Sequence, residues 1–294
     1  MIGADWFLLG APWDCSGSAR GEQAAPEALR TAGLTGLVGL DLGDAPCVIQ
    51  GRHRDDVTGV LALADTVRAA HAVAGALGEA LRGVPRRRPL VIGGDCSILF
   101  GIFPALRRHV GPVGLWFIDG HPDYLDGATS ETGETADMDL AVLTGVGAEA
   151  LTGLAGPPPM VPVSEVVLLG HRASDLDQAA AVELAGVPTQ LRRIDAATVA
   201  GDPMVAGERA AAWLGGAARG VWLHLDVDVL DPLSMPAVTY PQSRGLHWDQ
   251  LAGLLEPLAR SPRLLGVSVA DLRPDLDPTG EYARRLVELL DRTL

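Results

Sequence analysis

The stretch that decides the fold is residues 113–123, which read VGLWFIDGHPD. Its first six residues form an apolar run, which is typical of a strand buried on both faces of a parallel sheet. The run ends in two carboxylates and an imidazole, namely Asp119, His121 and Asp123. Residues 221–232 read VWLHLDVDVLDP and repeat this pattern of an apolar run followed by carboxylates. Two strands are therefore predicted, each with acidic groups at its carboxyl end.

These acidic groups predict a site for two metal ions. In an extended chain, side chains at positions i, i+2 and i+4 share one face, so Asp119, His121 and Asp123 can converge. Asp226 and Asp228 can converge in the same way. Such a cluster repels itself and is costly to bury unless protons or cations neutralise it. Four carboxylates can offset two divalent ions, and carboxylate with imidazole suits manganese, with zinc, iron, cobalt and nickel as alternatives. The simpler alternative is that each Asp only caps a following helix, but two matching clusters favour metal binding.

Composition excludes several classes of protein. With 294 residues, 48% of them hydrophobic, the chain can bury a large core. No apolar run approaches the roughly 20 residues of a membrane span, and no basic region precedes an apolar core at the amino terminus, so we expect a cytoplasmic protein. A formal charge of -14 argues against nucleic acid or an anionic membrane as a partner. Three scattered cysteines fit a reducing compartment, and the absence of lysine excludes Schiff-base chemistry.

Alternating strand and helix patterns predict an α/β fold with a mostly parallel sheet, and we expect one domain over residues 1–294. Apolar runs predict strands at Trp6 to Leu9, Leu90 to Ile92, Val113 to Ile118, Val166 to Leu169, Val221 to Asp226 and Leu264 to Val269. Apolar residues at helical spacing predict helices over Pro26 to Ala32, Val57 to Leu81, Ser97 to Arg108, Leu176 to Ala185, Pro203 to Leu214, Trp248 to Arg260 and Gly280 to Leu290.

Three motifs make the chain resemble the ureohydrolase superfamily of arginases, agmatinases and related guanidino hydrolases. The motifs are Gly93-Gly94-Asp95-Cys96-Ser97, Asp119 to Asp123 and Asp226 to Pro232. A weaker amino-terminal pattern is matched by Gly10, Gly21, Pro26 and Arg30. The resemblance implies a three-layer α/β/α domain around a binuclear manganese site. It also implies hydrolysis of a guanidino or related amidine C–N bond, which releases urea or a substituted urea and an amine.

The resemblance also implies which side chains bind the two ions. One ion would be held by residue 96, Asp119, Asp123 and Asp226, and the other by Asp119, His121, Asp226 and Asp228. Cys96 is a departure, because family members usually have His at this position. A thiolate can replace imidazole as a ligand, and it shifts the preference toward softer metals. The alternative is that Cys96 is a small buried core residue beside a weak metal position. We favour ligation. Some relatives with Cys here are similar to a hydroxyarginine hydrolase, so loss of activity does not follow from the exchange.

Four residues are candidates for substrate binding on the same resemblance. Thr132 and Glu134 fall where arginases hold the amino-acid end of the substrate, and Glu134 would attract an ammonium group and repel a carboxylate. Asp177 matches a substrate-binding Asp with a two-residue shift. Asp271 falls where many members hold the guanidinium with the longer Glu. The alternative for Thr132 and Glu134 is a polar loop with a helix amino terminus at Ala136 to Leu140, and a loop or helix cap is the alternative for Asp271.

Proton transfer is the second departure from the family. The catalytic or proton-shuttling His of the family falls on Ala136, which cannot transfer protons. Asp123 would orient the nucleophile and carry its proton toward the leaving amine, while Asp271 holds the reacting guanidinium. His224 and His247 are candidates for the missing role, and His224 precedes Asp226 by two residues and can face the same way. For both, a structural role is the alternative.

The leading interpretation is a metal-dependent C–N hydrolase that acts on a small guanidino compound. A second interpretation is a catalytically silent member that binds a ligand or metal, because the usual His is missing at both positions 96 and 136. The two differ at Cys96, which the hydrolase needs and a binder does not. The related metal-dependent deacetylases are disfavoured because the chain has no His-His pair. Family members often form trimers or hexamers, so a homo-oligomer is compatible with the sequence.

Overall fold

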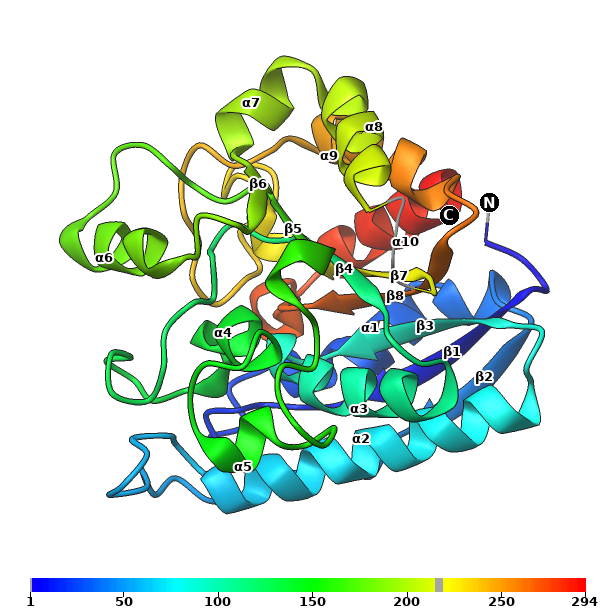
Figure 1. Cartoon of the computed structure of the whole chain (residues 1–294). Helices are drawn as coiled ribbons and strands as arrows, with labels where there is room; N and C mark the ends of the chain where they lie inside the picture. The colour runs from blue at the N-terminus through cyan, green and yellow to red at the C-terminus, as the bar shows by residue number, and fades with distance from the viewer. Residues whose placement is uncertain (1, 215–218) are drawn as a thin grey trace.

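A parallel sheet of eight strands forms the centre of the molecule in the computed structural model, which describes residues 2–214 and 219–294 (Figure 1). The strands follow the order β2-β1-β3-β8-β7-β4-β5-β6, and each neighbouring pair is parallel. Their bounds are β1 Trp6–Ala11, β2 Leu40–Asp44, β3 Arg88–Gly93, β4 Gly114–Ile118, β5 Val166–Leu169, β6 Arg192–Ile194, β7 Val221–Asp226 and β8 Leu264–Ala270. The expected α/β fold with a parallel sheet is confirmed.

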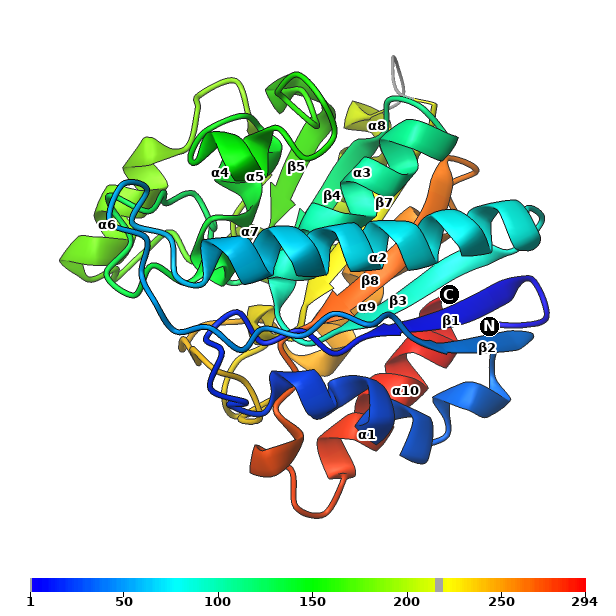
Figure 2. The same ribbon diagram turned by 90° about the horizontal axis from the view of Figure 1, so that it is seen from below.

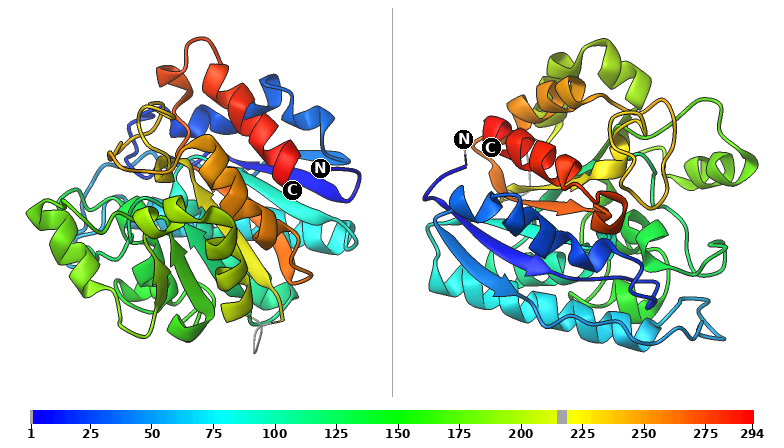
Figure 3. Two further views of the ribbon diagram at one scale, coloured as in Figure 1. Left: turned by 90° about the horizontal axis from the view of Figure 1, so that it is seen from above. Right: turned by 180° about the vertical axis from the view of Figure 1, so that it is seen from behind.

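Helices cover both faces of the sheet and complete three layers (Figures 2 and 3). One face packs against α1 Ala25–Thr31, α7 Ala196–Gly201, α8 Pro203–Trp213, α9 Trp248–Ala259 and α10 Glu281–Thr293. The other face packs against α2 Leu63–Gly83, α3 Leu99–His109, α4 Asp139–Leu143 and α5 Glu149–Thr152. The remaining helix, α6 Gln178–Gly186, stands out at the end of the sheet where the strands finish (Figure 1). Within the described residues, no helix is long and apolar enough to cross a membrane.

The central strands are buried on both sides, which explains their continuous apolar sequences. In β4, Trp116 and Ile118 contribute to one core, whereas Leu115 and Phe117 contribute to the core on the opposite face. Side chains of a strand alternate between the faces of a sheet, and here both faces are covered by helices. An apolar residue is therefore required at every position of the strand.

The edge strands β2 and β6 were not predicted. β2 is partly or fully exposed at all five of its residues, and β6 is a three-residue strand with two exposed arginines. These edge strands are covered less completely by the helices than the central strands are, and so they do not need the apolar run by which the central strands were found. The short helices α5 and α7 were missed because four and six residues carry too little periodicity. The helix α4 was foreseen only as the alternative of a helix start at Ala136 to Leu140.

The predicted start of α2 was wrong. A helix was expected from Val57, but α2 begins at Leu63. Before it lies a loop in which Gly59 and Ala62 have positive φ angles of 73° and 51°, incompatible with a right-handed helix. Arg54 holds this loop by donating a 2.7 Å hydrogen bond to the carbonyl oxygen of Gly59, and Val57 points into solvent.

The strand order brings four loops together. Strands β8 and β7 are the last two in sequence, yet they lie between β3 and β4 in the sheet. The carboxyl ends of parallel strands meet at one edge of the sheet, and that edge is the usual place for a site in α/β proteins. The carboxyl ends of β3, β4, β7 and β8 and the loops that follow them carry Cys96, Asp119 to Asp123, Asp226 to Asp228 and Asp271.

Candidate metal centre and active site

The turn after β3 positions Cys96. The carboxylate of Asp95 accepts hydrogen bonds from the backbone N–H of Ser97 at 2.9 Å and from that of Cys15 at 2.7 Å. Gly94 allows the turn to approach a neighbouring loop, because a Cβ at this position would lie 1.6 Å from the carbonyl oxygen of Trp13. The Gly-Gly-Asp part of the motif therefore holds the turn that presents the Cys96 sulfur.

The loops after β4 and β7 are hydrogen bonded to each other. The Asp119 carboxylate accepts the backbone N–H of His121 at 2.6 Å, and His121 Nδ1 lies 2.7 Å from Asp228 Oδ2. The other oxygen of Asp228 accepts the N–H of Gly120 at 3.0 Å. Asp226 in turn accepts the N–H of Asp228 at 2.7 Å. These bonds orient the acidic side chains toward a common space.

Arg172 is a buried residue behind these loops whose role the sequence did not reveal. Its guanidinium donates hydrogen bonds of 2.6 to 3.1 Å to four backbone carbonyl oxygens. The carbonyls belong to Asp228, Val229, Leu230 and Gln242. A single planar cation with five N–H donors thus organises the third motif.

The substitution Arg172→Leu is expected to destabilise the protein strongly. An orphaned buried carbonyl costs about 1–3 kcal/mol, so the free energy of unfolding should fall by about 3 kcal/mol or more. Denaturation in urea measures this change, with Arg209→Leu as the matched control because Arg209 is exposed and stacks on Trp213. Equal stability of the two variants would contradict the organising role of Arg172.

The six predicted metal ligands are brought together by the fold. Their ligand atoms form overlapping groups of three in which all atoms lie within 4.8 Å of one another. The groups are Cys96–Asp119–Asp226, Asp119–His121–Asp228, Asp226–Asp228–Asp271 and Cys96–Asp123–Asp139. The first two groups fall within the two ligand sets that the family resemblance implies. Asp271 and Asp139 are additional members.

The charges in this cluster fit divalent cations. Burial, followed by the repulsion of neighbouring acids, raises the pKa values of Asp119, Asp123 and Asp226 well above the usual range. Burial also disfavours ionised Asp228, but His121, Arg172 and the backbone N–H of Gly120 together outweigh burial and lower the pKa of Asp228. Burial likewise disfavours imidazolium at His121, yet Asp228 raises its pKa. Crowded carboxylates that resist ionisation are stabilised by cations, and oxygen, imidazole and sulfur donors are all metal ligands.

Cys96 is held from behind by a chain of hydrogen-bonding groups. Its sulfur lies 2.7 Å from Asp226 Oδ2 and 3.1 Å from His224 Nε2. His224 Nδ1 lies 2.7 Å from the hydroxyl of Ser268, which accepts a 2.8 Å hydrogen bond from the indole N–H of Trp222. An indole N–H can only donate, so the Ser268 hydroxyl is free to donate a hydrogen bond to Nδ1 of His224. The ring then carries its hydrogen on Nε2, and this N–H is directed at the Cys96 sulfur. Burial lowers the pKa of His224 to about 3, which keeps the ring neutral.

The predicted catalytic roles of the two other imidazoles do not match their positions. His224 is fully buried, stacks on Phe117 and lies behind Cys96, outside the pocket. His247 precedes α9, and its Nδ1 lies 2.9 Å from the Ser234 hydroxyl. Among the described residues that line the pocket, His121 is the one imidazole. Neither His224 nor His247 therefore lines the pocket.

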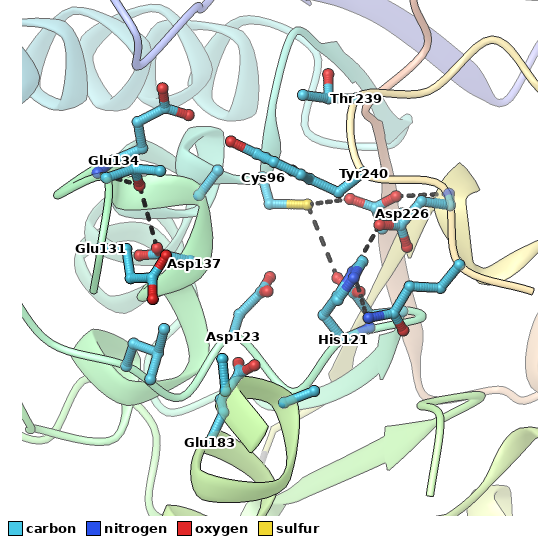
Figure 4. Close-up of a pocket in the computed structure, with 18 of the residues that line it drawn as sticks. Cys96, His121, Asp123, Glu131, Glu134, Asp137, Glu183, Asp226, Thr239 and Tyr240 are labelled. Atoms are coloured by element: carbon cyan, nitrogen blue, oxygen red, sulfur yellow. Dashed lines mark hydrogen bonds and ion pairs between the residues drawn. The ribbon is translucent and has the colours of Figure 1, made fainter. Parts of the chain in front are cut away.

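A pocket of about 870 Å³ opens above the acidic cluster (Figure 4). Its wall includes the four residues expected to bind substrate, namely Thr132, Glu134, Asp177 and Asp271. Ala136, on which the resemblance places the family's proton-shuttling His, also lines it. Asp271 is nearly buried, and its Oδ2 accepts the backbone N–H of Thr239 at 3.1 Å.

Two of these side chains already have partners within the protein. Glu134 Oε2 lies 3.0 Å from a guanidinium nitrogen of Arg20, and Arg20 also contacts Glu22 at 3.0 Å. Arg20 is shared by two carboxylates and so compensates the charge of Glu134 in part, which weakens the expectation that Glu134 alone attracts an ammonium group. Asp177 caps α6 by accepting the N–H of Ala180 at 2.9 Å, so it combines a structural position with a place on the pocket wall.

Several pocket residues were missed by the sequence analysis. Glu183 on α6 points toward the cavity (Figure 4) and accepts the backbone N–H of Tyr124 at 3.0 Å. Asp137 lines the pocket, and burial raises its pKa to about 7. Tyr240 contributes a ring that lies 5.7 Å from the Arg20 guanidinium carbon. The available signal for Glu183 was its place as the one charged residue of α6.

Comparison with known proteins gives the chain a family. A sequence model of the arginase family matches residues 4–294. The arginase of Brevibacillus brevis is 31% identical over 289 residues, which cover 96% of this chain and 95% of that protein. The arginase of Bacillus caldovelox is 30% identical over 295 residues, covering 96% of this chain and 95% of that protein. Its solved structure matches with a TM-score of 0.86 and 28% identity, covering 100% of this chain and 98% of the other. The expected resemblance is confirmed, and the chain belongs to the arginase family.

Proposed function

We propose that the protein hydrolyses a C–N bond of a guanidino compound at a centre of two divalent metal ions, with manganese as the first choice. The observation that carries this proposal is the convergence of six ligand side chains at the floor of one pocket, in a chain of the arginase family. Cys96, Asp119, Asp123 and Asp226 would hold one ion, and Asp119, His121, Asp226 and Asp228 the other. When bound, the two ions lower the pKa of a water molecule and so supply a nucleophile near neutral pH.

Two carboxylates of the chain would act on the substrate, one by binding its guanidinium group and the other by transferring a proton. Asp271 lies beside the Asp226–Asp228 pair on the pocket wall, where its carboxylate can accept hydrogen bonds from a guanidinium group. Asp123 also lines the pocket and can receive the proton of the nucleophile and return it to the leaving amine. Because Ala136 offers no proton, Asp123 carries this role without an imidazole.

The pocket wall favours a substrate with a cationic tail. No arginine is among the described residues that line the pocket, and the chain has no lysine. Acidic side chains are frequent on the wall and include Glu131, Asp137, Asp177 and Glu183. A substrate carboxylate would be repelled by this wall, whereas an ammonium group would be attracted. We therefore propose an amine-ended guanidino compound, such as agmatine, in preference to arginine.

A substrate panel tests this proposal. Manganese-loaded protein is incubated with agmatine, arginine, hydroxyarginine, guanidinobutyrate or guanidine, and release of urea or hydroxyurea is measured beside chelator-treated protein. We expect kcat/KM for agmatine to exceed that for guanidinobutyrate by about tenfold or more, since this ratio requires about 1.4 kcal/mol of discrimination. A preference for guanidinobutyrate would contradict the substrate class. Release from no compound with any metal would favour the alternative of a catalytically silent binder.

A further inference from the structure

Asp139 is a buried carboxylate that belongs neither to the family's ligand set nor to the pocket wall. It is the first residue of α4 and is completely inaccessible to solvent. Neither of its carboxylate oxygens has a hydrogen-bond partner. Burying a polar group without hydrogen bonds is costly, and buried carboxylates in folded proteins are normally paired or bound to metals.

The unpartnered carboxylate lies beside two predicted metal ligands. One ligand atom each of Cys96, Asp123 and Asp139 lie within 4.8 Å of one another, and all three residues are buried. The start of α4 is fixed to Asp123, because the backbone N–H groups of Leu140 and Ala141 donate to the Asp123 carbonyl oxygen at 3.1 and 3.2 Å. Asp139 is therefore held in place relative to the other two side chains by main-chain bonds.

The part of α4 that holds Asp139 is also tied to the turn that carries Cys96. The hydroxyl groups of Ser97 and Thr135 lie 2.8 Å apart, and both residues are fully buried. Thr135 begins the short 3-10 turn that leads into α4. Position 139 is thus connected to both of its neighbours in the cluster, and a cation between them would be enclosed by rigid backbone.

A cation accounts for this arrangement better than any group of the chain. The charged neighbours of Asp139 are Asp95, Asp137 and Asp123, which are all acids and add to the negative charge. A bound proton would remove the charge of Asp139, but its O–H group would still lack an acceptor. A metal ion would supply both the positive charge and a partner for the carboxylate lone pairs.

We propose that Asp139 is an additional protein ligand of the cation held by Cys96 and Asp123. This inference rests on the metal centre of the proposed function and extends its ligand set. One sulfur and carboxylate oxygens then bind the ion at the position where family members usually provide an imidazole. The extra carboxylate supplies a hard oxygen donor beside the soft sulfur, and it raises the negative charge that attracts the cation. α4 becomes part of the metal centre.

The test compares Asp139→Asn with the wild-type protein after chelation and reloading with Mn²⁺ or Co²⁺. Bound metal per chain is measured after desalting, and affinities are measured by calorimetric titration. We expect the wild type to hold two equivalents, and Asp139→Asn to lose one of them or to bind it at least about tenfold more weakly. In the metal-free state, Asp139→Asn should unfold at the same or a higher temperature than the wild type, because it removes a buried carboxylate that has no partner.

Asp277→Asn is the matched control. Asp277 is also buried and also has one unpartnered oxygen, but it accepts the N–H of Ala283 at 2.9 Å beside α10 and belongs to none of the ligand groups. The Asp277→Asn variant should be less stable than the wild type and should keep both metal equivalents. Asp139→Ser repeats the test without introducing an amide N–H.

The outcomes separate this inference from the proposed function. Wild-type metal stoichiometry and affinity in both Asp139 variants would overturn the ligand role. The ligand role would also be overturned if the metal-free Asp139 variants had unfolding temperatures well below that of the metal-free wild type, because that result would give Asp139 a structural role. If the wild type binds two ions that depend on Asp139 but releases no urea from any guanidino compound, the proposed reaction fails while the ligand assignment stands.

Discussion

Replacing Asp226 with Asn should reduce urea release by about a thousandfold or more, because metal ions supply several kcal/mol of transition-state stabilisation. Asp226 belongs to two of the candidate ligand groups and lies 2.7 Å from the Cys96 sulfur. Its second oxygen accepts the N–H of Asp228 and so orients the next ligand. Asn keeps the shape of the side chain but replaces one acceptor oxygen with a donor and removes the charge. Metal content should fall together with activity.

Asp231→Asn provides the control within the same motif. Asp231 accepts the backbone N–H groups of Leu233 at 3.0 Å and Arg244 at 2.7 Å, and it is not part of the pocket wall. The substitution should cost about 1 kcal/mol of stability at most and leave both metal equivalents in place. Full activity in Asp226→Asn, measured as urea release with metal content determined on the same sample, would contradict its role as a shared ligand.

Replacing Cys96 with Ala is expected to remove one metal equivalent and to lower urea release by about a hundredfold, in line with the loss of a directly bound ligand. The sulfur lies within 4.8 Å of the ligand atoms of Asp119 and Asp226, and no other sulfur or nitrogen donor belongs to that group of three. This substitution also decides between the two functional interpretations. A silent binder would tolerate the loss of Cys96 with unchanged ligand binding and no activity to lose.

Introducing His at position 96, the family's usual residue, should not by itself give a centre that binds metal well. In Cys96→His, a larger ring would have to enter a site where His224 Nε2 already lies 3.1 Å from the sulfur, and overpacking a core costs about 1–3 kcal/mol. The double variant Cys96→His with His224→Ala makes room for the new ring. Metal affinity should be higher in the double variant than in Cys96→His alone, a coupling that a double-mutant cycle with His224→Ala quantifies. Additive effects would contradict direct packing between positions 96 and 224.

The metal motifs could be predicted from the sequence because their information is local. Asp119 directly follows β4 and Asp226 is the last residue of β7, and the apolar runs of both strands are unambiguous. The extended chain that was expected to align the neighbouring ligands is not present, because Asp228 lies in a 3-10 turn over Val227–Val229 and Asp123 has a positive φ angle of 47°. The presence of Cys96 in place of the family's usual His could likewise be recognised from the local sequence. The α/β class followed from the same apolar runs and their alternation with helical patterns.

What the sequence did not reveal depends on distant contacts. Glu134 was predicted to bind the substrate because its actual partner, Arg20, lies 114 residues away in the sequence and could not be recognised from it. Asp139 carries no local signal in the sequence. It lies close to Cys96 only because α4 packs against the turn that follows β3. His224 does lie two residues before Asp226 as expected, but two residues of strand place it about 7 Å deeper, where Cys96 separates it from the pocket.

The most direct test of the account is a joint measurement of bound metal and urea release on one preparation of the wild-type protein. The protein is stripped with a chelator, reloaded with Mn²⁺ in steps and assayed with agmatine at each step. The account predicts that urea release is absent from the stripped protein and rises with metal content to a plateau at two equivalents per chain. Urea release that persists without metal, or two bound equivalents with no release from any guanidino compound, would contradict it.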